Sequence, residues 1–375
     1  MLHQPVRQTS IAEFLQSYQG GGSVHFFSPS LLAAKLAEFQ RGFGGLVTFA
    51  VKANPTEDVL STLCHGGLHG FDVASPEEIA LARKICPTAA LHYNNPVRTR
   101  AEVEFGVANG VASWSVDDWD ELEKLLARVP EDAEIAVRFK LPVEGAAYNF
   151  GAKFGATPPL AAMMLARVAE AGRKPSLTFH VGTQCVDPAA WGQYVGEAAA
   201  IAAEAGVTIE RLNIGGGFPA SRNYRVEMMP FFTAIKEALG AFPVQPTLIC
   251  EPGRGLVADA FALAVQIKSV RNDCIYLTDG VYGGLSELLS MPAPSFAVLS
   301  EKGWRKGPHR PRKAFGPTCD SIDVLRDPLE LPIYLDEGDW IVFRSMGAYV
   351  TGVTTRFNGY GSIEMVTLDT LDAPF

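Results

Sequence analysis

The sequence predicts an α/β protein, a TIM-type (β/α)8 barrel joined to a C-terminal, mostly antiparallel β domain. Between residues 24 and 257 short apolar runs alternate with helical patterns, as in repeated βα units around a parallel sheet. About eight such units in a segment of this length fit a closed barrel. After residue 257 short β-rich runs are separated by Gly, Pro and Asp, which is typical of antiparallel strands.

The predicted domains are residues 24–257 for the barrel, and residues 1–23 with 258–375 for the β-rich domain. An open, doubly wound sheet is the alternative architecture. No G-x-G-x-x-G motif follows the first strand, so a dinucleotide site has little support. In a barrel the chemistry lies where the strands run into the following loops.

The predicted barrel strands are apolar runs bounded by turn residues. In chain order they are VHFF (24–27), LVTFAVK (46–52), GFDVA (70–74), LHYNN (91–95), ASWSV (112–116), EIAVRFK (134–140), LTFHVG (177–182), RLNIGGG (211–217) and PTLICEPG (246–253). Helical patterns occupy SPEEIALARKI (75–85), VDDWDELEKLLARV (116–129) and DPAAWGQYVGEAAAIAAEAG (187–206). The first of these begins with a serine N-cap followed three residues later by a glutamate. The β-rich domain contains FALAVQIKSV, CIYLTDGVYG, FAVLS, LPIYL, DWIVF and SIEMVTL.

Composition narrows the class of function. The chain has 375 residues, 47% of them hydrophobic, and a net charge of −9, which predicts a globular protein and disfavours nonspecific nucleic-acid binding. No apolar stretch approaches the ~20 residues of a membrane helix, and the first residues lack a secretory signal, so we expect a cytoplasmic protein. Six cysteines without C-x-x-C spacing argue against a disulfide framework and a zinc site. Most of them are expected to be buried thiols, and no metal site is predicted.

Polar residues recur at the ends of the predicted strands, where side chains from different barrel strands converge on one rim. They are Lys52, Asp72, Arg138, His180, the glycines Gly215, Gly216 and Gly217, Glu251 and Arg254. A small-molecule site at this rim is the function that the pattern favours.

Each of these residues has an ordinary alternative. Lys52, in FAVKANP (49–55), is either a solvated strand-end lysine or an amine made nucleophilic toward carbonyls by desolvation. The glycines of IGGGFP (214–219) form either a tight turn or a phosphate cradle. The Glu251–Arg254 pair is either a surface ion pair or a carboxylate for a pyridine nitrogen beside a guanidinium for phosphate.

His180 is either a core histidine or a ring that stacks on a planar cofactor. Together, an amine, a phosphate cradle and a carboxylate for a pyridinium specify pyridoxal 5'-phosphate (PLP), with Lys52 as its Schiff-base lysine.

The same residues lie in motifs that resemble a known family. The matching pieces are VKANP, FDVAS-PEE, KFGA (153–156), HVGTQ, NIGGGFP, EPGRGLV, DGVYGG (279–284), FGPTCDSID (315–323) and MGAYVTGVTTRFNGY (346–360). They span nearly the whole chain. The sequence resembles the PLP-dependent ornithine/lysine/diaminopimelate decarboxylase family, which has an alanine-racemase-like fold, and within it the ornithine decarboxylases.

The resemblance implies a role for each matching position. Lys52 would carry the cofactor, Glu251 would pair with its ring nitrogen, His180 would stack on the ring, and Asp72 and Arg138 would support the pocket. The phosphate would be bound by Thr183, the Gly215–Gly217 loop, Arg254 and Tyr349. The family usually has serine at the position of Thr183, and the hydroxyl is retained here. Glu78 matches a further acidic residue near the cofactor.

The resemblance also implies a homodimer, because this family builds each active site across a two-fold interface. Cys319, as the acid that protonates Cα, and Asp320 would then come from the partner subunit. In the alternative interpretation Cys319 is a buried thiol and Asp320 a turn residue. Racemases of the same fold place an arginine against the pyridine nitrogen, so Glu251 and the Cys319–Asp320 pair favour decarboxylation. A non-catalytic relative that binds a regulatory protein should have lost cofactor residues, and none is missing here.

The substrate is predicted to be a cationic amino acid, with L-ornithine, converted to putrescine, first. Ornithine decarboxylases hold the distal ammonium with two aspartates, and Asp320 matches the first, whereas Met291 occupies the second position. A pocket with Asp320 and Met291, together with Tyr282 and Phe357, could instead take a sulfonium such as S-methyl-L-methionine. Glu287 is an alternative second acid. Lysine and diaminobutyrate remain open, and diaminopimelate is disfavoured because its decarboxylases have a Cys-Glu pair.

Overall fold

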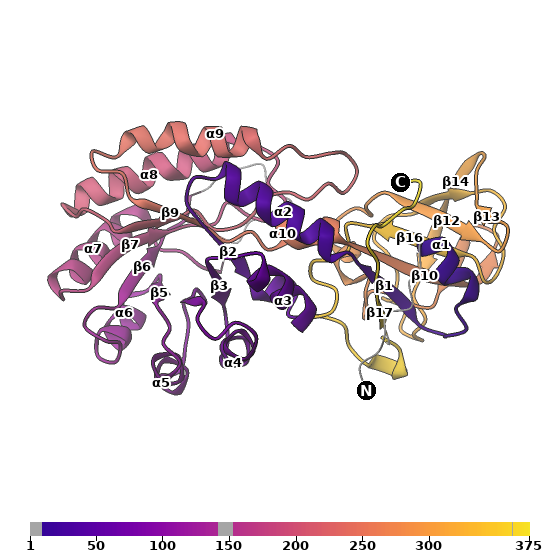
Figure 1. Ribbon diagram of the computed structural model, residues 1–375, viewed down its shortest axis with the longest axis horizontal. Helices are drawn as coiled ribbons and strands as arrows, with labels where there is room; N and C mark the ends of the chain where they lie inside the picture. Colours follow the sequence, from indigo (N-terminus) through magenta and orange to yellow (C-terminus); the bar gives the residue numbers. More distant parts are fainter. Residues whose placement is uncertain (1–9, 142–152, 362) are drawn as a thin grey trace. The chain divides into compact units, whose positions relative to one another are not determined.

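The structure is a computed structural model that describes residues 10–141, 153–361 and 363–375. The chain forms two compact units (Figure 1). The barrel unit contains Lys35–Pro219 and Val226–Leu256, and the β unit contains the N-terminal segment up to Ala34, Ala220–Arg225 and Val257–Phe375. Residues 24–34 therefore lie in the β unit, although the sequence analysis began the barrel at residue 24.

The barrel unit contains a closed barrel of parallel strands, as predicted. Its strands are β2 (Leu46–Ala50), β3 (Gly70–Val73), β4 (Ala90–Tyr93), β5 (Ser113–Val116), β6 (Glu134–Arg138), β7 (Lys174–Thr178), β8 (Arg211–Asn213) and β9 (Thr247–Cys250). The barrel closes where β9 pairs with β2, with Ile249 opposite Leu46. All eight strands run in the same direction, so the residues that follow them share one rim.

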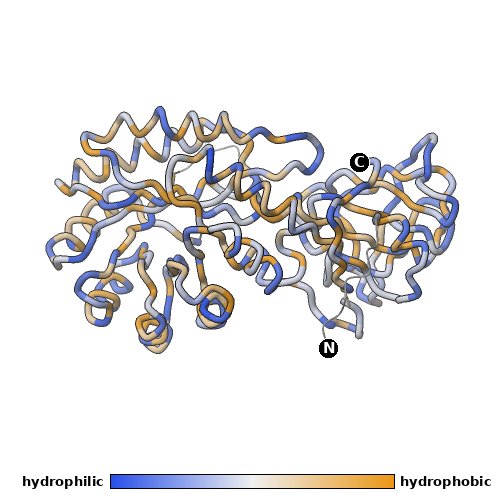
Figure 2. Tube along the Cα trace, viewed as in Figure 1, coloured by the Kyte–Doolittle hydropathy of each residue, from blue (hydrophilic) through white to orange (hydrophobic). Residues whose placement is uncertain are grey.

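Helices separate successive strands along the chain. They are α2 (Pro29–Gly42), α3 (Glu57–His65), α4 (Pro76–Ile85), α5 (Arg100–Ala108), α6 (Trp119–Leu126), α7 (Pro158–Glu170), α8 (Ala189–Ala205), α9 (Met229–Ala238) and the short α10 (Arg254–Val257). Apolar and polar residues alternate along these helices in Figure 2, as expected for helices with one face on a core. Within the described ranges, no helix is long and apolar enough to cross a membrane.

The predicted helix boundaries are set by local capping. Ser75 caps α4 by accepting a hydrogen bond from the backbone N–H of Glu78 at 3.3 Å, and Glu78 in turn accepts from the N–H of Ala74 at 2.7 Å. The helix predicted from residue 116 begins later, because Val116 ends β5 and the Asp118 side chain caps α6. Helix α8 ends at Gly206, which adopts φ 66°, the left-handed conformation that favours glycine.

The strand predicted at residues 24–27 is real, but its assignment to the barrel is wrong. Strand β1 (Ser23–Phe27) pairs antiparallel with β10 (Phe261–Arg271) and parallel with β17 (Ile363–Thr367), both in the β unit. Every residue of β1 is buried. A strand covered on both faces lacks the alternation of apolar and polar residues, so its pattern resembles that of a parallel barrel strand.

The β unit is built on a mostly antiparallel sheet in the order β13-β12-β16-β10-β11-β14-β15, with β1 beside β10 and β17 beside β1. Its remaining elements are α1 (Ile11–Ser17), β11 (Cys274–Leu277), β12 (Phe296–Ser300), β13 (Gly303–Trp304), β14 (His309–Phe315), β15 (Leu329–Pro332) and β16 (Trp340–Arg344). Side chains of β10 alternate between two apolar clusters, since Leu263 and Val265 enter one and Ala262 and Ala264 enter the other. The sheet therefore has a core on each face.

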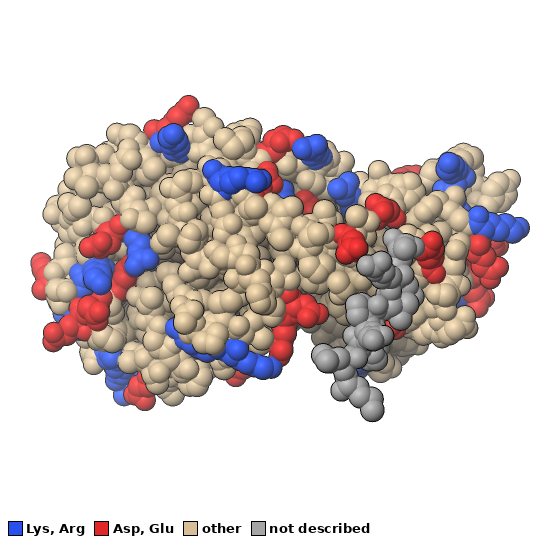
Figure 3. All heavy atoms as spheres, viewed as in Figure 1, with Lys and Arg blue, Asp and Glu red and all other residues tan. Residues whose placement is uncertain are grey.

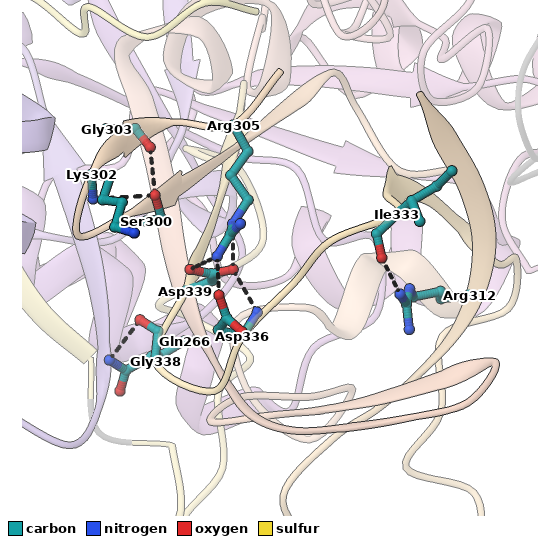
Figure 4. A network of polar contacts seen from close by, with 10 residues as sticks. All are labelled: Gln266, Ser300, Lys302, Gly303, Arg305, Arg312, Ile333, Asp336, Gly338 and Asp339. Atoms are coloured by element: carbon teal, nitrogen blue, oxygen red, sulfur yellow. Dashed lines mark hydrogen bonds and ion pairs between the residues drawn. The ribbon is translucent and has the colours of Figure 1, made fainter. Parts of the chain in front are cut away.

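An ion pair fastens the turn before β16 in the β unit (Figure 4). The Arg305 guanidinium donates from Nε to Oδ2 of Asp339 at 2.7 Å and from Nη2 to Oδ1 of the same carboxylate at 3.0 Å. A second contact joins Arg305 to Asp336 at 2.6 Å.

On the face of the molecule in Figure 3, Lys and Arg are interspersed with Asp and Glu.

The cysteines depart from the prediction. Cys64, in the last turn of α3, and Cys86, at the end of α4, form a disulfide across these neighbouring helices. Cys185 and Cys250 are buried thiols as expected, but Cys319 is exposed. The disulfide could not be predicted from the sequence, because the two cysteines are 22 residues apart and meet only when α3 packs on α4.

Replacing both Cys64 and Cys86 by serine should lower the free energy of unfolding by about 3 kcal/mol, because the disulfide restricts a loop of the unfolded chain. Denaturant unfolding without reductant measures the change. Cys274→Ser, at a half-buried free thiol, is the control and should change stability by less than about 0.5 kcal/mol. Equal midpoints for the double variant and the parent would show that the disulfide adds no stability.

Candidate active site

The predicted barrel residues lie where their strands end. Lys52 is in the 3-10 turn η1 (Val51–Ala53) just after β2, Arg138 is the last residue of β6, and Glu251 follows β9 directly. The predicted strand 46–52 is therefore shorter, because the chain turns after Ala50 and Asn54 N–H closes the turn on the Val51 carbonyl at 3.0 Å. The rim that the sequence predicted is present.

Lys52 and Asp72 form an ion pair, with Nζ 3.0 Å from Oδ2. The Asp72 side chain is 2% exposed, whereas that of Lys52 is 48% exposed. Of the two alternatives for Lys52, the structure has the half-exposed amine, since η1 carries Lys52 out of the strand. Oδ1 of Asp72 is buried, and no described residue donates a hydrogen bond to it. This unsatisfied oxygen indicates room for a further donor beside the amine.

Glu251 is a buried carboxylate, 7% exposed. Its pKa is raised from 4.5 to about 8, chiefly by burial and next by the nearby Asp72 carboxylate. A hydrogen bond from Asn213 and the charges of Lys52 and Arg138 act in the opposite direction. Glu251 is therefore poised between its charged and neutral forms near neutral pH, and an added positive charge beside it would favour the carboxylate.

Two asparagines that the sequence analysis did not single out hold Glu251. Asn94, directly after β4, and Asn213, the last residue of β8, each donate from Nδ2 to Oε1 of Glu251. No described residue donates to Oε2. Both asparagines lie at strand ends, within the predicted strands LHYNN and RLNIGGG. That position could have indicated that their side chains reach the site at the rim.

The three consecutive glycines are required by close backbone contacts. Gly215 and Gly217 adopt φ 65° and 90°, in the left-handed region. A Cβ on Gly216 would lie 2.7 Å from the carbonyl oxygen of Glu251, and one on Gly217 would lie 2.4 Å from that of Gly182. Among the described residues, the backbone N–H groups of Gly216 and Gly217 have no hydrogen-bond acceptor. A tight turn and a pair of donors for an anion thus coexist in this loop.

The remaining barrel residues surround this rim. Nδ1 of His180 accepts a hydrogen bond from the Gly182 N–H at 3.0 Å, so the neutral ring carries its proton on Nε2. Burial, then the nearby charges of Arg138 and Lys52, lower the pKa of His180, which favours this neutral form. Thr183 and Arg254 are buried.

Glu78 lies near the Lys52–Asp72 pair. The pKa of its carboxyl is raised from 4.5 to about 7, chiefly by burial, while the hydrogen bond from the Ala74 N–H opposes the shift. The Asp72 charge adds to the increase and the Lys52 charge reduces it. Glu78 thus belongs to the same electrostatic cluster as the two residues of the ion pair, as its predicted place near the cofactor suggests.

Predicted residues of the β unit form a second cluster. The Tyr282 hydroxyl donates to Oδ2 of Asp320 at 2.6 Å, and this hydrogen bond lowers the pKa of Asp320. The rings of Tyr282 and Phe357 lie 4.8 Å apart, and the Cys319 thiol donates to Oδ1 of Asn358 at 3.4 Å. Cys319 is exposed, so its expected alternative as a buried thiol is wrong. Three loops far apart in sequence thus bring an acid, a thiol and two aromatic rings together.

Three further predicted residues lie outside this second cluster of contacts. Met291 is 3% exposed and packs inside the β unit. The Glu287 carboxylate lies 3.6 Å from Nη1 of the buried Arg222, so this acid already faces a cation of its own chain. Tyr349 adopts φ 56°, a left-handed conformation that is rare for a tyrosine. Its carbonyl accepts a weak hydrogen bond from the Ser286 hydroxyl at 3.5 Å.

The barrel residues fit PLP. An amine at Lys52 suits its aldehyde, the N–H groups of Gly216 and Gly217 suit its phosphate, and the open Oε2 of Glu251 suits a protonated ring nitrogen. The buried and unsatisfied oxygen of Asp72 is consistent with a site that is completed by a bound group.

Comparison with known proteins identifies the class. Residues 30–258 match the family described as pyridoxal-dependent decarboxylase, pyridoxal binding domain, and the chain belongs to this family. Curated relatives include ornithine decarboxylase of Mus musculus, 32% identical over 338 residues that cover 83% of this chain and 73% of the relative. Antizyme inhibitor 2 of Xenopus laevis is 30% identical over 340 residues, with the same coverage of both chains.

Solved structures of decarboxylases have the same fold as this chain. The arginine decarboxylase of Paramecium bursaria Chlorella virus, bound to agmatine, superimposes with a TM-score of 0.85 at 26% identity, over 95% of this chain and 98% of that one. The lysine/ornithine decarboxylase of Vibrio vulnificus, complexed with cadaverine, gives 0.82 at 28% identity, over 94% and 96%. This protein is a PLP-dependent amino-acid decarboxylase of the group that acts on basic amino acids.

Proposed function

We propose that the enzyme decarboxylates L-ornithine to putrescine and so serves polyamine biosynthesis. The observation that carries the choice of a cationic substrate is the Asp320 carboxylate, which Tyr282 holds beside the Phe357 ring. The Tyr282 hydrogen bond keeps Asp320 ionised, so it can pair with a distal ammonium. Similarity to ornithine decarboxylase favours a substrate with the chain length of ornithine.

In this proposal the barrel residues bind and orient the cofactor. Lys52 would hold PLP covalently through its amine, Asp72 and Arg138 would keep that amine in place, and the neutral His180 ring would stack on the cofactor. The phosphate is bound by Thr183, Arg254 and the N–H groups of the Gly215–Gly217 loop, to which the resemblance adds Tyr349. Bound PLP supplies the sink for the electron pair that is left when carbon dioxide departs.

Two side chains act on protons in the proposed reaction, one on the proton of the ring nitrogen and one on the proton given to Cα. Glu251, as a carboxylate, keeps the ring nitrogen protonated, because its negative charge in a buried site favours the cationic form of that nitrogen. Cys319 delivers a proton from Sγ to the substrate Cα after carbon dioxide has left, and its exposure allows it to reach a substrate. We propose that Cys319 and Asp320 act on the active site of the partner subunit in a homodimer.

The sulfonium amino acid S-methyl-L-methionine is the second candidate. Of the two expected acids only Asp320 is present, since Met291 is apolar and the alternative acid Glu287 faces Arg222. A primary ammonium gains more from a second carboxylate than does a methylated sulfonium, which donates no hydrogen bond from its charged centre. Lysine and diaminobutyrate differ from ornithine only in length and belong in the same comparison.

Carbon dioxide release from ornithine, lysine, arginine, diaminobutyrate and S-methylmethionine tests the proposal on the purified, cofactor-loaded enzyme. We expect the highest kcat/KM for ornithine, and a decrease of about 10- to 100-fold in Asp320→Asn, the range for a lost hydrogen bond to a charged group. Asp327→Asn, at a half-exposed acid beside Arg326, is the control and should leave kcat/KM unchanged. Turnover confined to S-methylmethionine would overturn the assignment of ornithine.

A further inference from the structure

The Oε1 atom of Glu251 accepts hydrogen bonds from two neutral side chains, the amides of Asn94 and Asn213. Resting on the proposed function, we propose that Asn94 and Asn213 are positioning residues that favour the carboxylate form of Glu251 and leave its Oε2 as the acceptor for the ring nitrogen of PLP. We refer to these two amides as the asparagine clamp.

The orientation of Asn213 is fixed by its own backbone surroundings. Its Oδ1 accepts a hydrogen bond from the Gly215 N–H at 2.9 Å, so its Nδ2 is the atom left to face Glu251. Asn213 is 6% exposed, which removes water as a competing partner. The glycine loop that bears the phosphate donors and the clamp on Glu251 are therefore joined through one side chain.

Asn94 is held by the loop that follows β4. Its backbone N–H donates to the Val73 carbonyl at 3.1 Å. The preceding carbonyl, of Tyr93, accepts from the buried Arg98 guanidinium at 2.9 Å. Both contacts restrict the loop, so Nδ2 of Asn94 meets Oε1 of Glu251 at a small entropic cost.

Neutral donors suit this task better than cationic ones. A lysine or arginine in direct contact with Glu251 would compensate the negative charge that the ring nitrogen needs. An amide stabilises that charge by a hydrogen bond and does not cancel it. Three charged groups also face Glu251, namely Asp72, Lys52 and Arg138. Burial and Asp72 favour the protonated form, and the clamp and the two cations oppose them.

Asn94→Ala and Asn213→Asp test the clamp. The first removes one donor, and the second replaces a donor by an acceptor while retaining Oδ1 for the Gly215 N–H. Infrared difference spectra of the cofactor-free chain follow the carbonyl band of the protonated Glu251 carboxyl, which is assigned by its loss in Glu251→Gln. We expect its titration midpoint to rise by about one pH unit in Asn94→Ala, and by more in Asn213→Asp.

Asn95→Ala is the matched control, because Asn95 is the next residue of the same loop and donates to the Ala74 carbonyl rather than to Glu251. Its midpoint should equal that of the parent. In the holoenzyme, kcat should fall about 10-fold in Asn94→Ala with KM changed less than about twofold, since the lost interaction supports the reaction rather than substrate binding.

Unchanged infrared midpoints in both clamp variants would overturn the inference, whatever their activity. Shifted midpoints in a chain that releases no carbon dioxide from any basic amino acid would instead support the clamp and contradict the proposed function. A midpoint shift in Asn95→Ala as large as in Asn94→Ala would show that the loop, not the amide, sets the titration of Glu251.

Discussion

Lys52→Ala is expected to lower decarboxylation by at least about a thousandfold, because no other side chain can replace the amine that carries the cofactor. Borohydride treatment should fix PLP to the parent chain at Lys52 and leave the variant unlabelled. Peptide mass spectrometry of the reduced protein and carbon dioxide release measure the two effects. The half-exposed side chain of Lys52 makes the amine accessible to both the cofactor and the reductant.

Removing Lys52 also leaves the buried Asp72 without its cation, so some activity could be lost through unfolding. Lys52→Arg separates the two effects, because it retains a positive charge but supplies no nucleophilic amine. It should be folded and inactive. Lys84→Ala, at an exposed lysine paired with Glu57, is the control and should retain full activity. Label at a lysine other than Lys52 would contradict the assignment.

Glu251→Gln is expected to lower kcat by about 100- to 1,000-fold, the range for losing one strong electrostatic contact in an active site. An amide has no negative charge, so it cannot keep the ring nitrogen protonated. The control is Glu134→Gln, at another buried barrel glutamate, which begins β6 and pairs with Arg211 at 2.8 Å. Glu134 lies at the N-terminal end of its strand, where residues contribute to stability rather than to chemistry. Its loss should reduce stability and leave kcat intact.

The same variant changes how stability depends on pH. The pKa of Glu251 is raised from 4.5 to about 8 on folding, so between these values the folded chain retains a proton that the unfolded chain has released. Stability of the cofactor-free chain therefore decreases as pH rises from about 4.5 to about 8, by on the order of a few kcal/mol. Glu78, with its pKa raised to about 7, acts in the same direction.

Denaturant unfolding at several pH values checks this prediction. The free energy of unfolding of the parent minus that of Glu251→Gln should be largest near pH 4.5 and should decline toward pH 8. A difference that stays constant across this range would show that Glu251 titrates normally in the folded chain. Cofactor binding should reduce the decline, because a cationic ring nitrogen favours the carboxylate.

Much of the site was visible in the sequence because barrel chemistry falls at strand ends. Lys52, Asp72, Arg138 and Glu251 were found from the apolar runs that precede them, and the parallel barrel was confirmed. Asn94 and Asn213 were missed, since an asparagine at a strand end usually caps a turn, and only the folded chain reveals that both amides meet one carboxylate.

Two further predictions, for strand β1 and for the cysteines, were wrong because they depend on tertiary packing. Strand β1 is buried on both faces, so its pattern could not distinguish a barrel strand from a strand that pairs with β10 and β17. The disulfide between Cys64 and Cys86 depends on how α3 packs on α4. Met291 is buried, and its place beside the substrate stays a prediction.

Local periodicity and composition were enough to predict the alternation of strands and helices and the residue types at strand ends. Tertiary structure decided which atoms meet: two amides on one oxygen of Glu251, Tyr282 on Asp320, and Arg222 beside Glu287. These contacts join residues far apart along the chain, and their energies depend on distance and burial, which exist only after the chain has folded.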